Sequence, residues 1–181
     1  MRRTVRITRL LPYPPEIVWS ALTDPTKVSK WLMPTDRIPL SPGEVFTFRM
    51  AAQRGWDGLT HCEIVTADAP HTLSYSYRGH ATGEKALRCA GIDAEAALKA
   101  GKGLFAQLDT LVTFALFADP SCDGTARTRL SFEQAGYRGL KMVLVSYVME
   151  AGWRKLLDRR LPGVLAEDAG APSGGAPRSD S

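Results

Sequence analysis

PPEIVWSALTDPTKVSKWLMP, residues 14–34, carries two short apolar patterns with the same i, i+3, i+4 spacing, which is the spacing of one face of a helix. The first pattern consists of Val18, Ala21 and Leu22, and the second of Val28, Trp31 and Leu32. Asp24-Pro25 stands between them, and an N-cap residue followed by proline at the first helical position starts a new helix. Pro34 ends the second pattern because proline disfavours helical geometry in the residue before it. We therefore expect two short helices that turn a corner.

Runs of alternating apolar and polar residues on both sides of this stretch predict β-strands. The clearest run is Thr72–Arg78, in which Leu73, Tyr75 and Tyr77 alternate with polar residues. We expect one strand before the two helices and about six after them, and the legible runs are 4–11, 45–50, 60–66, 72–78, 109–117 and 125–133. Consecutive short strands favour an antiparallel meander, whose concave face a single helix would cover.

The C-terminal part of the sequence predicts a long helix over Tyr137–Leu165. Its middle, MVLVSYVM, is apolar nearly all round, so we expect burial on more than one side. Gly152 would permit close packing of this helix.

Residues 79–105, rich in Gly, Ala and Lys, predict a lid or a mobile surface loop. Residues 167–181 lack apolar anchors and predict a disordered tail, so the expected domain spans residues 1–166.

Composition and charge argue against several classes of protein. The 181 residues include 23 Lys and Arg against 19 Asp and Glu, a net charge of +4. The densest basic group is expected to be the solvated face of a helix, and it comprises Arg154, Lys155, Arg159 and Arg160. We therefore predict no nucleic-acid partner. The absence of an apolar run of about 20 residues predicts no membrane span, and the N-terminus lacks a signal-peptide pattern, so we expect a cytoplasmic protein.

The sequence predicts neither a metal site nor a cofactor. Cys62, Cys89 and Cys122 lie far apart and form no CxxC pair, so we expect buried or incidental thiols. No HExxH motif and no glycine-rich phosphate loop is present. A Ser-His-Asp or Cys-His arrangement is not legible, because the members of such triads meet in space rather than in sequence.

Five segments, in this order, resemble the START-like (SRPBCC) superfamily and, within it, the group named after the activator of the heat-shock-protein-90 ATPase. They are PPEIVWSALTDPTKVSKWL, SPGEVFTF, EIVTADAPHTLSYSY, DGTARTRLSFEQAGY and MEAGWRKLLDRRL. The resemblance covers about residues 4–165 and departs from the family at the insertion 79–105. It implies an α+β helix-grip fold, in which a curved antiparallel sheet wraps around a long C-terminal helix and two short helices follow the first strand. It also implies a cavity for apolar small molecules and no shared catalytic motif.

Apolar side chains that face inward from the strands and helices are the candidate ligand-binding residues, because such a cavity needs walls from both. They are Trp31, Phe46, Phe48, Tyr75, Tyr77, Phe114, Leu130, Phe132, Met149 and Trp153. The alternative for each is that it fills the core, since aromatic residues at strand spacing are more often core than binding site.

A few titratable residues are candidates for chemistry. The hydroxyls of Tyr75 and Tyr77 could orient a polar group of a ligand or act as weak acids. His61 and Glu63 alternate on one face of a strand, where they would form either an acid–base pair or a solvent-facing ladder pair.

These observations together predict non-catalytic binding of an apolar or aromatic small molecule between the curved sheet and the C-terminal helix. Two alternatives stay open. One is an enzyme that acts on a hydrophobic substrate, as a polyketide cyclase does, with Tyr75, Tyr77 and His61 as its candidate residues. The other is a chaperone-associated interaction module of the stress response, for which the family name alone speaks. The sequence also leaves open whether the protein forms a homodimer.

Overall fold

The computed structural model of the chain describes residues 1–52, 57–79, 107–120 and 126–170. Its elements in chain order are β1 (Arg2–Leu11), α1 (Pro15–Thr23), α2 (Pro25–Trp31), β2 (Val45–Arg49), β3 (Leu59–Asp68), β4 (Thr72–Arg78), β5 (Asp109–Pro120), β6 (Ala126–Arg138), α5 (Gly139–Lys155), the π-helical segment η2 (Leu156–Arg160) and α6 (Leu161–Gly170). The predicted insertion, apart from Gly79, and the predicted tail from residue 171 lie outside the described residues, as do Cys89 and Cys122.

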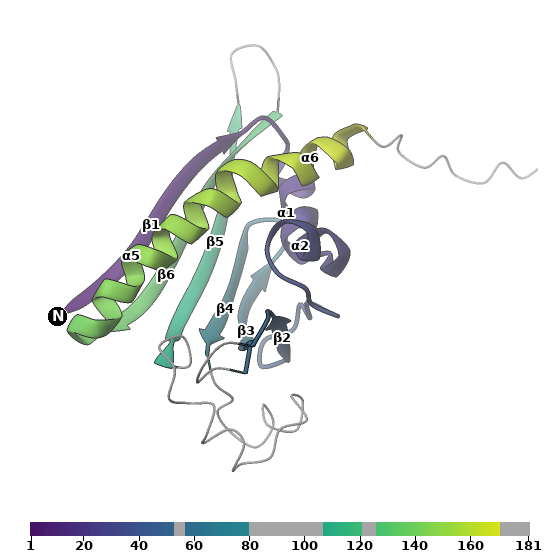
Figure 1. Cartoon of the computed structure of the whole chain (residues 1–181). Coiled ribbons are helices and arrows are strands. Elements are labelled where there is room, and N and C mark those ends of the chain that lie inside the picture. Colours follow the sequence, from purple (N-terminus) through teal and green to yellow (C-terminus); the bar gives the residue numbers. More distant parts are fainter. Residues whose placement is uncertain (53–56, 80–106, 121–125, 171–181) are drawn as a thin grey trace, which may run out of the picture.

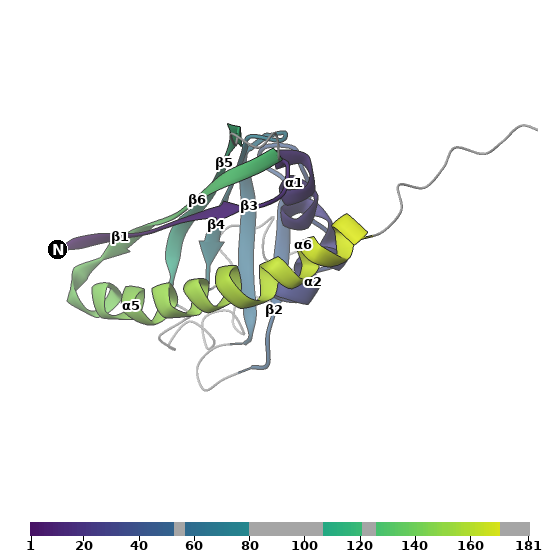
Figure 2. The ribbon, with the colours of Figure 1, turned by 90° about the horizontal axis from the view of Figure 1, so that it is seen from above.

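The strands form one six-stranded sheet in the order β1-β6-β5-β4-β3-β2, with every neighbouring pair antiparallel. The C-terminal helix lies along one face of this sheet, and α1 and α2 lie at the end where α6 is found (Figure 1, Figure 2). The predicted α+β helix-grip fold is therefore confirmed. Five strands follow the two helices in the described part of the chain, one fewer than expected.

Several strands extend beyond the runs that the sequence pattern predicts. β6 continues to Arg138 and pairs there with the start of β1, where Arg2 lies opposite Arg138. β5 likewise continues beyond the predicted run, to Pro120, and its residue Asp119 lies opposite Arg127 of β6. These extensions follow from pairing between strands that are distant in sequence, because a neighbouring strand satisfies the backbone groups whatever the side chains are.

The two short helices turn a corner at Asp24, as the sequence predicts. The Asp24 carboxylate accepts hydrogen bonds from the backbone N–H groups of Thr26 (2.8 Å) and Lys27 (3.2 Å), so this residue caps α2. The Trp31 indole N–H donates to the backbone carbonyl of Ala21 at 2.8 Å, which joins the end of α2 to α1. The corner is therefore fixed by one cap and one buried hydrogen bond.

The C-terminal helix begins at Gly139, two residues later than predicted, because Tyr137 and Arg138 are the last residues of β6. Gly139 has a φ of +82°, a backbone conformation that favours glycine, and it makes the turn from strand to helix. The helix continues to Gly170, so residues 167–170 of the predicted tail are helical. Their carboxylates pair with α2, Glu167 with Lys30 at 2.7 Å and Asp168 with Lys27 at 2.6 Å.

The core lies between the sheet and the helices and contains a continuous series of aromatic rings. Neighbouring rings of the series have centroids 4.4–6.3 Å apart, in the order Phe46, Tyr75, Phe114, Phe132 and Trp153. Since these residues come from β2, β4, β5, β6 and α5, the series ties the helix to most of the sheet. No helix among the described residues is both long and apolar enough to cross a membrane.

Candidate ligand-binding site

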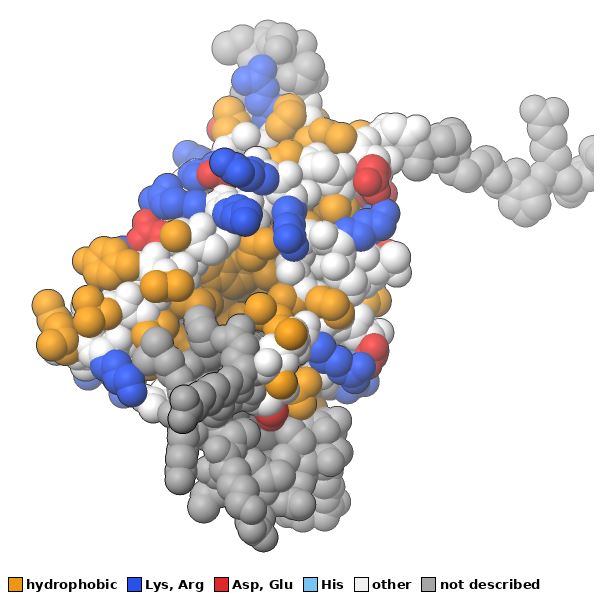
Figure 3. All heavy atoms as spheres, viewed as in Figure 1, with side chains coloured by type: hydrophobic (Ala, Val, Ile, Leu, Met, Phe, Trp, Pro, Cys, Tyr) orange, Lys and Arg blue, Asp and Glu red, His pale blue; other side chains and the backbone are white. Residues whose placement is uncertain are grey.

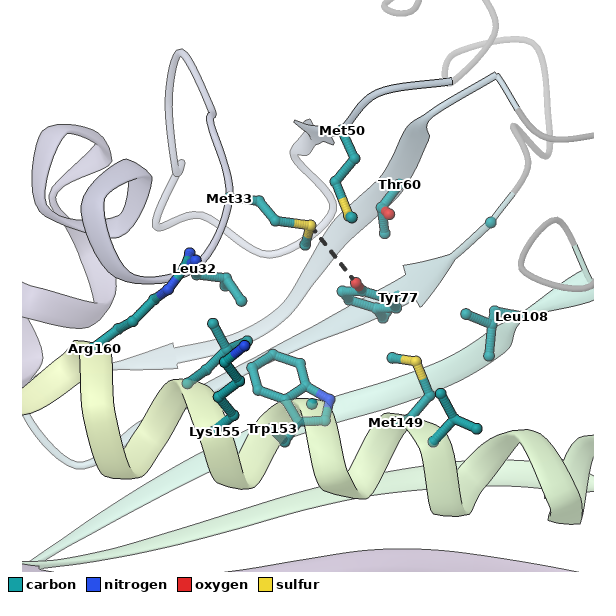
Figure 4. A pocket seen from close by; sticks show the side chains of 14 residues that line it. Leu32, Met33, Met50, Thr60, Tyr77, Leu108, Met149, Trp153, Lys155 and Arg160 are labelled. Atoms are coloured by element: carbon teal, nitrogen blue, oxygen red, sulfur yellow. Dashed lines mark hydrogen bonds between the residues drawn. The ribbon is translucent and has the colours of Figure 1, made fainter. Parts of the chain in front are cut away.

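A cavity of about 360 Å³ lies between the C-terminal helix and the edge of the sheet at which β2 and β4 end and β3 and β5 begin. The surface view shows a hollow among hydrophobic side chains beside the helix, and the close-up shows its walls (Figure 3, Figure 4). The described residues that line it are Leu32, Met33, Met50, Thr60, Tyr77, Gly79, Leu108, Val148, Met149, Gly152, Trp153, Lys155, Leu156 and Arg160. The walls are thus mostly apolar and come from sheet, loop and helix together.

Two local features of the sequence leave this space open. The second short helix ends before Pro34, so Leu32 and Met33 leave it and form one wall, and the Arg49 backbone N–H holds the following loop through the Pro34 carbonyl at 2.9 Å. On the opposite wall Gly152 lies in α5, and a Cβ atom placed there would meet nothing within 4 Å. Gly152 therefore leaves room in the cavity, and the expectation that it permits close packing is wrong.

Tyr77 presents a buried hydroxyl group to the cavity. Its hydroxyl donates to the Met33 sulfur at 4.0 Å, and a thioether is a weak acceptor, so this hydroxyl can still serve a ligand (Figure 4). Burial raises the pKa of Tyr77, an effect that the nearby Cys62 reinforces and Thr60 opposes. The hydroxyl is consequently protonated at neutral pH and acts as a hydrogen-bond donor.

A buried chain of hydrogen bonds fixes the cavity wall behind Trp153. The indole N–H of Trp153 donates to the Gln134 side-chain oxygen at 2.7 Å, and the Gln134 amide donates to the Thr110 hydroxyl at 2.9 Å. That hydroxyl donates in turn to the backbone carbonyl of Tyr77 at 3.0 Å. Gln134 is completely buried, and the chain joins α5, β6, β5 and β4, so both aromatic walls are held in place.

Two cations lie at the mouth of the cavity. Lys155 and Arg160 are exposed and both contribute to the lining, which includes no Asp or Glu among the described residues. The sequence-based interpretation places both on a solvated helix face. Both are exposed in the structure, as expected, and they also line the rim of the cavity, while Arg154 pairs with Glu150 at 2.8 Å.

Most of the chain matches a known protein family in sequence. The sequence model of the family described as "Activator of Hsp90 ATPase homolog 1-like protein" matches residues 12–166. The chain belongs to this family. The resemblance drawn from the five sequence segments is thereby confirmed. A comparison with functionally curated proteins gives no match.

Solved structures share the fold of this family member. Protein MLL2253 from Mesorhizobium loti is 27% identical, with a TM-score of 0.66 over 91% of this chain and 98% of that one. CalU16 from Micromonospora echinospora is 19% identical, with a TM-score of 0.58 over 93% and 79% of the two chains. DynU16, described as a putative protein in the dynemicin biosynthetic locus, is 20% identical, with a TM-score of 0.59 over 91% of this chain and 48% of that one.

The ten predicted ligand-binding residues divide into two groups in the structure. Tyr77, Met149 and Trp153 line the cavity. The other seven belong to the packed core, and they are Trp31, Phe46, Phe48, Tyr75, Phe114, Leu130 and Phe132. Contact with a ligand stays a prediction for all ten, and the geometry gives direct access to the first three.

Sequence reasoning missed most of the other lining residues. Met33 and Leu108 come from loops, where no periodic pattern marks a side chain as inward-facing. Met50 follows β2 in the same alternation as Phe46 and Phe48, so the pattern could have indicated it. For the helix a signal did exist, because Met149, Trp153 and Leu156 share the spacing of one helical face. Gly152 lies on the same part of the helix, and a residue without a side chain among bulky ones indicates an unfilled space beside the helix.

His61 and Glu63 do not reach the cavity. Successive side chains of a strand alternate between the two faces, and Thr60 of β3 lines the cavity, so these two residues lie on the opposite face of the sheet. Glu63 lies 3.6 Å from the Arg78 guanidinium, whereas His61 is buried, so the solvent-facing interpretation is wrong for His61. Cys62 is buried too, and burial raises the pKa of its thiol, which fits the expected inert role.

Proposed function

We propose that this protein binds an apolar or aromatic small molecule in the cavity between its C-terminal helix and its sheet, without catalysing a reaction on it. The observation that carries the proposal is the cavity of about 360 Å³, whose walls are mostly apolar and contain a few polar groups. Ligand sites have this character and typically a volume of about 300–1,000 Å³.

The fixed position of the walls supports binding rather than loose packing of a core. Trp153 is held by Gln134 and contacts Tyr77, with ring centroids 6.2 Å apart. A movement of Trp153 into the cavity would leave the buried Gln134 side-chain oxygen without its donor, which costs free energy. A site that is formed before the ligand arrives loses little ordering free energy on binding.

An enzymatic role finds less support in the same geometry. Of the three candidate residues, Tyr77 alone lines the cavity, since Tyr75 belongs to the core and His61 lies on the other face of the sheet. Burial raises the pKa of Tyr77, so this hydroxyl is a weak acid and is not ionised as a base at neutral pH. A cytoplasmic location stays a prediction, and a chaperone contact and a homodimer stay open alternatives.

A thermal-shift screen of the purified protein against apolar and aromatic compounds tests the proposal. A compound at 100 times its dissociation constant should stabilise the protein by about 2.7 kcal/mol, because it binds the folded state alone. A binding compound should also remain chemically unchanged after prolonged incubation, as seen by mass spectrometry. Failure of every compound to raise the melting temperature would contradict the proposal, and turnover would favour the enzyme.

A further inference from the structure

Among the described residues, the charged side chains that line the cavity mouth are all positive. Lys155 and Arg160 line the mouth, and neither side chain makes an ion pair or a hydrogen bond with any described residue. The described lining contains no carboxylate that could neutralise them. We propose that the ligand is an organic anion, with an apolar or aromatic body in the cavity and one acidic group that pairs with Lys155 and Arg160. This inference rests on the proposed function of ligand binding.

Carboxylates elsewhere on the C-terminal helix are already engaged by other cations. Glu150 accepts from Arg3 and from Arg154, and these bonds lower the pKa of its carboxyl, with Arg154 the larger cause. Asp158 accepts two bonds from Arg9, at 2.5 and 2.9 Å, which likewise lower its pKa. The fold therefore pairs the helix carboxylates with cations outside the cavity and leaves the two cavity cations for another partner.

The carboxylates of the C-terminal helix that lie next to α2 are also paired with cations. Lys27 pairs with Asp168 and Lys30 pairs with Glu167. Both carboxylates are thus held on the side of α2. An anion that enters the cavity would meet Lys155 and Arg160 without competition from these pairs.

The π-helical segment places the two cations at the same opening. In a regular α-helix, residues five positions apart point about 140° away from each other, since a turn contains 3.6 residues. Between Lys155 and Arg160 the chain forms η2, in which the Leu161 N–H donates to the Leu156 carbonyl, five residues back. The wider turn reduces the angle between the two side chains, and the close-up shows both leaving the helix on the cavity side (Figure 4). Such π-helical turns are rare and occur frequently at functional sites.

The position of the cations also fits the chemistry of an amphiphilic ligand. Both charges are exposed at the rim, where they keep most of their hydration, while Met33, Met149 and Trp153 offer an apolar surface next to them. An acidic group would therefore remain at the mouth as its apolar body enters. Since rim charges are screened by salt, the contribution of the acidic group should weaken as ionic strength rises.

Two fluorescent probes with the same aromatic body test the inference. 1-Anilinonaphthalene-8-sulfonate carries a permanent anion, and N-phenyl-1-naphthylamine is the same scaffold without it. We expect the wild type to bind the sulfonate roughly tenfold more tightly than the neutral amine. The variant Lys155→Gln/Arg160→Gln should lose this preference and still bind the amine within about twofold of the wild type.

A matched control removes the same net charge outside the cavity. Lys141→Gln/Arg159→Gln changes two exposed cations that do not line the cavity, and it should keep the preference for the sulfonate. Gly152→Leu, which places a side chain in the cavity, should weaken the binding of both probes. Circular dichroism of each variant confirms that folding is intact.

The outcomes separate this inference from the proposed function. If the amine binds and the sulfonate binds no more tightly, or if Lys155→Gln/Arg160→Gln keeps the full preference, the anionic ligand is ruled out and cavity binding stands. If Gly152→Leu binds the sulfonate like the wild type, that anion binds elsewhere and the inference is likewise overturned. If neither probe binds the wild type, the proposed function fails and this inference fails with it.

Discussion

At the scale of single residues, Gln134 connects the core to the cavity. It is fully buried, its oxygen accepts from Trp153 and its amide donates to Thr110. Gln134→Leu should leave the indole N–H without an acceptor and lower the free energy of unfolding by about 1–3 kcal/mol. Urea denaturation measures this loss, and Gln107→Leu, at an exposed position, should change stability by less than about 0.5 kcal/mol. Equal stability of Gln134→Leu and the wild type would contradict a structural role for this chain of hydrogen bonds.

The buried tyrosines predict how stability depends on pH. Burial raises the pKa of Tyr77 above its ordinary value near 10, so the folded protein holds this proton more tightly than the unfolded chain does. Stability is therefore retained below about pH 10 and falls as the pH rises further, by at most about 1.4 kcal/mol per pH unit for each such tyrosine. Tyr75 and Tyr137 shift in the same direction for the same first cause.

Replacing one tyrosine tests this pH dependence. In urea titrations at successive pH values, Tyr77→Phe should lose less free energy of unfolding above pH 10 than the wild type does. The variant lacks the hydroxyl proton that the folded protein holds more tightly than the unfolded chain. Tyr147→Phe is the control, since Tyr147 is 58% exposed. If the free energy of unfolding falls with pH above pH 10 equally steeply in Tyr77→Phe and the wild type, the assignment of Tyr77 as a buried, neutral hydroxyl is contradicted.

At the scale of elements, the corner between α1 and α2 closes one end of the sheet. Asp24 caps α2 through two backbone N–H groups, so Asp24→Ala should cost about 0.5–2 kcal/mol of stability. Pro25→Ala should also act mainly on stability. Neither change touches the cavity, so the affinity for N-phenyl-1-naphthylamine should stay within about twofold of the wild type. Loss of affinity at unchanged stability would show that the corner takes part in binding directly.

The elements differ in how far the sequence could predict them. α1 and α2 were predictable because caps, prolines and apolar spacing lie within a few residues of one another. The start of the C-terminal helix was not, because Tyr137 is apolar enough to suit a helix and is assigned to β6 by pairing with Arg3, more than 130 residues away. The helical residues 167–170 lack apolar anchors, and their ion pairs with α2 form only in the folded chain.

At the scale of the whole molecule, the sequence pattern predicts the fold but not the position and walls of the cavity. Alternating strands and one long helix specify a curved sheet with a helix on it, and aromatic residues such as Phe114 and Phe132 are correctly expected inside. A cavity is the volume that side chains from several elements fail to fill. It depends on where Met33, Met50 and Leu108 come together and on the absence of a side chain at Gly152, which no local pattern specifies.

The central claim is that an apolar ligand occupies this cavity, and two helical glycines give the most direct test. A Cβ atom meets nothing within 4 Å at Gly152 or at Gly163, and Gly152 alone of the two lines the cavity. Leucine at either position should raise helix propensity by several tenths of a kcal/mol, so both variants should fold.

The measurement is a fluorescence titration of N-phenyl-1-naphthylamine against wild type, Gly152→Leu and Gly163→Leu. Filling the cavity should weaken binding to Gly152→Leu by roughly tenfold or more, while Gly163→Leu and the wild type bind with dissociation constants within about twofold of each other. A folded Gly152→Leu that binds the probe as tightly as the wild type, or a wild type that does not bind it, would contradict the account.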